Sequence, residues 1–135
     1  MVVVNLSEAI EHARADVAEV GEGFVYNPGG ENRCFYVSQE DPRFPSGILE
    51  SAEREVASGS KTHGCQVGRI LMRAGLMTDE IASCQNSAIG VAQIMLGQDN
   101  DVAHFLSDIQ EAQDGGDSAG DALAKSLRSV RHTGR

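Results

Sequence analysis

The stretch HGCQVGRILMRAGL, residues 63–76, does most to decide the expected fold. Its apolar side chains recur at the spacing of one helix face, which predicts a helix over residues 64–74: Val67, Ile70, Leu71 and Ala74. Gly64 and Gly68 begin this helix, although each glycine destabilises a helix by roughly 1 kcal/mol relative to alanine. We therefore expect another backbone segment to approach the helix closely at these two glycines. Gly75 is the expected C-cap.

Capping residues and apolar spacing predict further helices on both sides of this stretch. Asn5 and Glu8 have the spacing of a capping box and begin a helix over about residues 6–20. Residues 84–96 are apolar nearly all round, which is typical of a buried helix. Thr78 and Ser118 are the expected N-caps of two of the remaining helices, which are placed at 48–57, 78–83, 101–113 and 119–130.

Two β-like runs, residues 24–26 and 34–37, flank a turn at residues 27–30 and predict a β-hairpin. Strand alternation exposes some of its aromatic side chains, and aromatic residues are good interface anchors. The candidate interface is therefore Tyr26, Phe35 and Tyr36. The expected fold class is α+β: a mostly helical, single compact domain over residues 1–135 with one β-hairpin, a core at about 5–130 and a loose tail at 131–135.

The chain is acidic, with a net charge of −9 that is unevenly spread. Eleven acidic and four basic residues among residues 1–60 give that part a net charge of −7. Nucleic-acid binding is unexpected, because phosphate neutralisation needs clustered Lys and Arg. The start MVVV lacks the basic region and long apolar core of a signal peptide, and no apolar run has transmembrane length. We expect a cytoplasmic protein that does not enter a membrane.

The cysteines offer the only candidate chemistry. Cys34, Cys65 and Cys84 form no CxxC pair and are expected to be reduced core thiols. A metal site is the alternative, with His63, Cys65 and Cys84 as its candidate ligands, but structural zinc sites usually have closely spaced ligand pairs. A further alternative is Cys65 as a nucleophile at a helix N-terminus, with His63 as its base. No catalytic motif is present, so we expect neither an enzyme nor a cofactor.

Three segments resemble small uncharacterised proteins of actinobacteria and their bacteriophages. GCQVGRILMRAGL, from Gly64, is similar to their GCLVG-A-L--LG stretch. QDGGDSAGDALAKS, residues 113–126, is similar to their QD-G--WG-AL ending, and CFYV to their C-YV segment. The shared region covers roughly residues 33–126, and Ala119 stands where those proteins usually have Trp. The resemblance implies an actinobacterial or actinophage origin and carries no activity.

The first functional hypothesis is a small protein-binding regulator, plausibly encoded by a phage and acting on a host or phage protein in the host cytoplasm. Exposed tyrosines on the hairpin would bind the partner. The alternatives are a DNA-mimicking inhibitor, suggested by the charge of −7 over residues 1–60, and a Cys65-dependent enzyme or small metal-binding protein. A homodimer is left open, because part of the apolar segment 84–96 is able to serve as a dimer contact.

Overall fold

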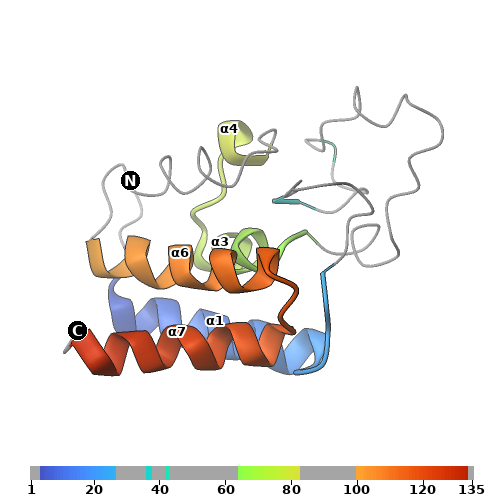
Figure 1. Cartoon of the computed structure of the whole chain (residues 1–135). Helices are drawn as coiled ribbons and strands as arrows, with labels where there is room; N and C mark the ends of the chain where they lie inside the picture. Colours follow the sequence, from blue (N-terminus) through green and yellow to red (C-terminus); the bar gives the residue numbers. More distant parts are fainter. Residues whose placement is uncertain (1–3, 27–35, 38–41, 43–63, 83–99, 134–135) are drawn as a thin grey trace.

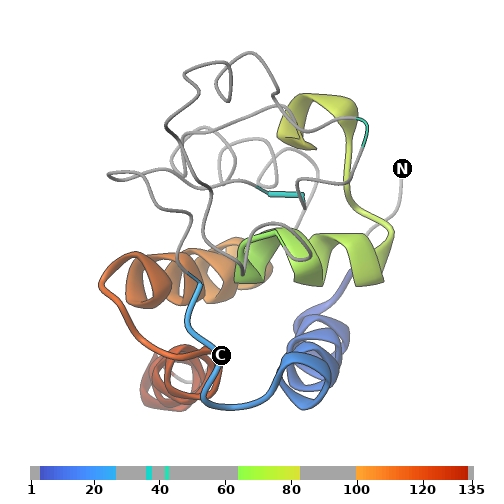
Figure 2. The ribbon, with the colours of Figure 1, turned by 90° about the vertical axis from the view of Figure 1, so that its right-hand side faces the viewer.

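The computed structural model describes residues 4–26, 36–37, 42, 64–82 and 100–133. Regular structure in these residues is helical throughout (Figure 1): α1 (Leu6–Val20), α3 (Gln66–Ala74), α4 (Asp79–Ala82), α6 (Asn100–Asp114) and α7 (Ala119–Thr133). Helices α6 and α7 form an antiparallel pair, and α1 lies beside α7 and runs opposite to it. Helix α3 crosses over α1 and α6, as the end-on view in Figure 2 shows.

The ends of these helices follow the capping residues closely. The side chain of Asn5 accepts the N–H of Glu8, and the side chain of Glu8 accepts the N–H of Asn5, so the predicted capping box is present. Thr78 and Ser118 accept N–H groups at the starts of α4 and α7, as predicted. Gly75 is left-handed, with a φ of 73°, and ends α3 in a Schellman motif. Helix α7 extends to Thr133, beyond the predicted end near residue 130.

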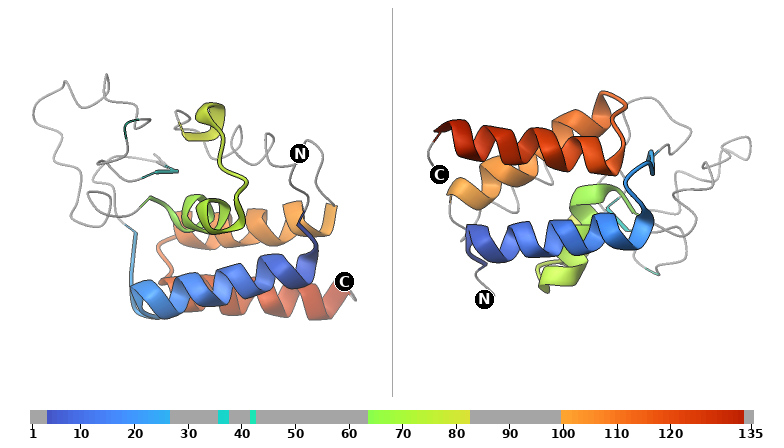
Figure 3. Two further views of the ribbon diagram at one scale, coloured as in Figure 1. Left: turned by 180° about the vertical axis from the view of Figure 1, so that it is seen from behind. Right: turned by 90° about the horizontal axis from the view of Figure 1, so that it is seen from below.

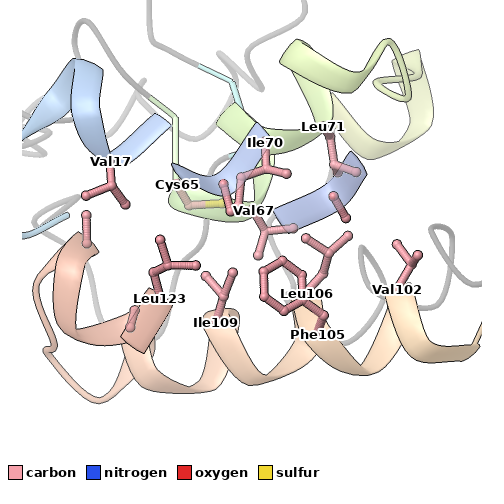
Figure 4. Packing of buried hydrophobic residues seen from close by; sticks show 14 of the residues in the cluster. Val17, Cys65, Val67, Ile70, Leu71, Val102, Phe105, Leu106, Ile109 and Leu123 are labelled. Carbon is pink, nitrogen blue, oxygen red and sulfur yellow. The ribbon is translucent and has the colours of Figure 1, made fainter. Parts of the chain in front are cut away.

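The core lies between α3, α6, α1 and α7, and it is built mainly from the predicted apolar stripes. In Figure 4 the apolar side chains of α3 point toward those of α6. The predicted stripes of α3 and α6 supply seven buried members: Val67, Ile70, Leu71, Val102, Phe105, Leu106 and Ile109. Ala13 and Val17 of α1 and Ala122 and Leu123 of α7 are buried members of the same core. Figure 3 shows α1 and α7 side by side under α6 and α3.

The predicted α+β class with a β-hairpin is wrong, because the described residues contain helices and no strand. The carbonyl oxygen of Phe24 accepts the N–H of Ala119 at 2.8 Å, and that of Glu22 accepts the N–H of Gly120 at 2.9 Å. Backbone groups that a hairpin would use for strand pairing therefore cap the N-terminus of α7. Residues 36–37 form a bend, and the predicted turn at 27–30 lies outside the described residues. So do the predicted helices at 48–57 and 84–96.

The close approach expected at Gly64 and Gly68 is confirmed, and the approaching segment is the backbone of Tyr36. A Cβ atom on Gly64 would lie 2.6 Å from the Tyr36 carbonyl oxygen, and one on Gly68 would overlap that oxygen. Gly64 precedes α3, which begins at Gln66, so only Gly68 is inside the helix. Within the run predicted as a strand, the backbone of Tyr36 thus packs directly on α3 (Figure 1).

Replacing Gly68 with alanine should destabilise the protein, although alanine favours a helix by about 1 kcal/mol. The added methyl group has no room beside the Tyr36 carbonyl, and overpacking of this kind costs roughly 1–3 kcal/mol or more. Urea unfolding gives the free-energy difference. Gly75→Ala is the matched control, because a methyl group on Gly75 meets no neighbouring atom. Alanine there should cost only about 1 kcal/mol of unfolding free energy, from the left-handed φ that glycine tolerates. A Gly68→Ala variant more stable than the parent would disprove the close approach.

An ion pair between Asp16 and Arg69 is buried where α1 meets α3. Arg69 Nε donates to Asp16 Oδ1 at 2.7 Å and Nη2 donates to Oδ2 at 3.1 Å. The third guanidinium nitrogen, Nη1, donates to the carbonyl oxygen of Gly64 at 2.8 Å, and the Phe24 ring lies under the guanidinium at 5.1 Å. The Asp16 side chain is 2% exposed and the Arg69 side chain 10%. Their spacing relative to the apolar residues of each helix predicts a polar, exposed face for both Asp16 and Arg69. That prediction is wrong, because both side chains are largely buried.

Asp16→Ala should cost about 3–5 kcal/mol of unfolding free energy, because it leaves a buried guanidinium without its carboxylate. The same two helices carry a matched exposed pair, Arg73 with Glu19, three or four residues further along each helix. Glu19→Ala should cost less than about 1 kcal/mol. Urea denaturation of both variants measures the two losses of unfolding free energy. Equal losses would show that the buried Asp16 pair contributes no more to stability than the exposed Glu19 pair.

Candidate functional site

The predicted tyrosine interface is not on the surface. Tyr26 is 7% exposed and Tyr36 is fully buried, so both contribute to the core. Phe35 lies outside the described residues. Tyr36 is buried where its backbone packs against Gly64 and Gly68, and Tyr26 follows the segment that caps α7. Neither tyrosine is available as a surface anchor in this conformation.

Cys65 lies at the N-terminus of α3 and is fully buried. Its Sγ is 4.0 Å from Oε1 of Gln110, which agrees with the expected packing of a core thiol. A substrate has no access to this sulfur in the conformation seen here. The other candidate ligands, His63 and Cys84, lie outside the described residues, as does Cys34. Within the described residues, no group of three or more His, Cys, Asp or Glu side chains is arranged to hold a metal ion.

Cys65 is the N-cap residue of α3, but its side chain makes no capping hydrogen bond. Buried glutamines instead form the hydrogen bonds at this helix end. Gln113 Oε1 accepts the backbone N–H of Gln66 at 2.7 Å, and Gln66 Nε2 donates to the carbonyl oxygen of Ala119 at 3.1 Å. Gln110 Nε2 donates to Asp114 Oδ1 at 2.9 Å. These contacts tie the start of α3 to the end of α6 and the start of α7. Since buried polar groups need partners, this network fixes the relative positions of the three helix ends.

A cleft of about 370 Å³ lies between the last turns of α6 and the facing side of α7. Its size is within the roughly 300–1,000 Å³ typical of ligand sites. From α6 and the turn after it come the residues spaced three and four apart on one face: Asp108, Glu111, Ala112 and Gly115. From α7 come Lys125 and Ser129, one turn apart. Asp117 completes the lining.

The turn between α6 and α7 places Asp117 over this cleft. Its N–H donates to the carbonyl oxygen of Ala112 at 3.1 Å, and the N–H of Gly116 donates to that of Gln113 at 2.9 Å. This is a Schellman arrangement, and Gly116 has the positive φ, 98°, that such an arrangement requires. The side chain of Asp117 lies beside α7, where Lys125 Nζ is 2.6 Å from its Oδ2.

The carboxylates around the cleft destabilise the C-terminal end of α6. Glu111 and Asp114 lie in its last turn, at the negative end of the helix dipole, and no basic residue occupies that turn. Asp108 adds a further carboxylate one turn earlier on α6, while Lys125 is the sole cation among the cleft-lining residues that the structure describes. An acidic helix end of this kind is unfavourable for folding and favourable for a cationic ligand. The acids between residues 108 and 117 are visible in the sequence, but no local pattern predicts that they line a cleft with Lys125.

No protein-family model, curated protein or solved structure matches this chain. The resemblance to small actinobacterial and actinophage proteins therefore stays a prediction. In the part of the chain that the structure describes, no helix is long and apolar enough to cross a membrane.

Glu111→Gln should raise the unfolding free energy by about 0.3–1 kcal/mol, because it removes a negative charge from the C-terminal turn of α6. Glu11→Gln is the control, since Glu11 is an exposed carboxylate in the middle of α1 and should change stability by less than about 0.5 kcal/mol. Chemical denaturation midpoints compare the two variants. A Glu111→Gln variant with a lower unfolding free energy than the parent would show that the Glu111 carboxylate stabilises the fold.

Proposed function

We propose that this chain is a small acidic protein-binding protein whose partner presents a basic segment to the cleft between α6 and α7. The observation that carries the proposal is the concentration of carboxylates around that cleft, from Asp108, Glu111 and Asp117, against one lysine. A basic segment supplies the charge that the last turn of α6 lacks. The partner is expected to be a host or phage protein in the cytoplasm, a hypothesis that fits the actinobacterial or actinophage origin implied by the sequence resemblance.

Two further features support binding at this place. The cleft is lined by a rigid helix pair, because α6 and α7 pack against each other along their lengths and Ser126 Oγ donates to the carbonyl oxygen of Phe105 at 2.8 Å. A site on packed helices holds its charged groups in fixed positions, which favours specific over diffuse attraction. The net charge of −9 also attracts a cationic partner over a longer distance and speeds association.

The alternatives receive less support from the described residues. A Cys65-dependent enzyme requires access to a thiol that is fully buried. A DNA-mimicking inhibitor requires carboxylates spaced along an extended face, whereas the carboxylates described above converge on one cleft. The DNA-mimic alternative is tested by the same binding measurement, because a DNA mimic binds basic proteins through charge spread over its whole surface.

The proposal is tested with a fluorescein-labelled lysine hexamer as a minimal basic segment, using fluorescence anisotropy at low salt. The double variant Asp108→Asn/Glu111→Gln should bind about tenfold more weakly than the parent, since two close charge pairs contribute on the order of 1.4 kcal/mol together. A glutamate hexamer should show no binding to any variant, because its charge has the same sign as the cleft.

The control removes the same charge from another surface. Glu8→Gln/Glu11→Gln neutralises two exposed carboxylates of α1, and glutamine preserves the capping box at Asn5. This variant should lose less than about threefold in affinity, which corresponds to long-range attraction alone. Equal losses for the two double variants would refute the cleft as the site and favour binding by diffuse surface charge.

A further inference from the structure

Among the described residues, Lys125 is the one cation that lines the cleft, and its side chain is already bound there. Its ammonium lies 2.6 Å from Asp117 Oδ2. Lys125 comes from the second turn of α7, so an alkylammonium group reaches into the space that the carboxylates of α6 face. The protein therefore contains, within its own chain, a group of the kind that the proposed partner would supply.

The two members of this ion pair differ in their exposure. The Asp117 side chain is 24% exposed and its Oδ2 is buried, and no hydrogen-bond donor of good geometry among the described residues serves that oxygen. The Lys125 side chain is 55% exposed. Moving Lys125 into water is inexpensive, because ion pairs of exposed lysines contribute little to stability. Leaving the Asp117 oxygen without any cation costs more, because a buried charge needs a partner.

From this asymmetry, and resting on the proposed function, we propose that Lys125 is an autoinhibitory occupant of the cleft. A lysine or arginine side chain of the partner replaces the Lys125 ammonium at Asp117, and Lys125 moves into solvent. No bond is made or broken, and the exchange conserves charge at Asp117. Affinity for the partner is thus lowered by the competition and depends on how well the incoming cation replaces the internal one.

If Lys125 is autoinhibitory, removing its charge should tighten binding of the basic segment. A purely structural role for Lys125 predicts no such gain in affinity. Lys125→Met removes the competitor and should bind the lysine hexamer roughly fivefold more tightly than the parent. Arg128→Met is the matched control, because Arg128 is exposed on the same helix, carries the same charge and does not line the cleft. Its affinity should rise by less than about twofold, through long-range charge alone.

A second comparison connects the effect to Asp117. The Asp117→Asn variant should bind the hexamer more weakly than the parent does. When Lys125→Met is added to this variant, the affinity should rise no more than it does when Arg128→Met is added. Thermal unfolding curves establish that every variant is folded at the temperature of the binding measurement. Equal gains for Lys125→Met and Arg128→Met in the parent background would overturn the inference and leave the cleft proposal standing. Absence of hexamer binding by the parent and by Lys125→Met would overturn both.

Discussion

A guanidinium buried where two helices cross is costly unless a carboxylate lies beside it, and Asp16 meets this requirement for Arg69 through two hydrogen bonds. The same guanidinium donates to the carbonyl oxygen of Gly64, just before α3, and lies over the ring of Phe24. Phe24 in turn accepts the N–H of Ala119 through its carbonyl oxygen. One side chain therefore connects α1, the start of α3 and the segment that caps α7.

This arrangement explains why the described residues of the two β-like segments, 24–26 and 36–37, form no strand. Residues 24–26 have high β-propensity, but their backbone is fixed by the N-terminus of α7 and by the contact of Phe24 with Arg69. The backbone of Tyr36 is fixed by α3, where Gly68 leaves room for its carbonyl group. In both places a helix provides the tertiary contact. Local propensity was overridden because these segments bury more by packing on helices than they would as an isolated hairpin.

The parts of the structure that sequence predicted well depend on neighbours three or four residues away. The capping box at Asn5 and Glu8, the C-cap at Gly75 and the apolar stripes all belong to this class. Asp16 was misplaced because charge alone assigned it to the solvent face, although it follows Ala13 by three residues and shares its buried side. Its partner lies 53 residues away along the chain, and no local pattern identifies such a contact.

The cleft illustrates the same limit from the functional side. The acids of 108–117 were visible in the sequence, but their convergence with Lys125 depends on the Schellman turn that folds α7 back along α6. Folding tolerates the acidic end of α6 because Gln110 and Gln113 donate to Asp114 and Lys125 compensates Asp117. Within the part of the chain that the structure describes, Asp108 and Glu111 form no ion pair, and both line the cleft. Local costs that a stable core does not require are commonest where a protein binds something else, and the acidic lining of this cleft agrees with the proposed cationic partner.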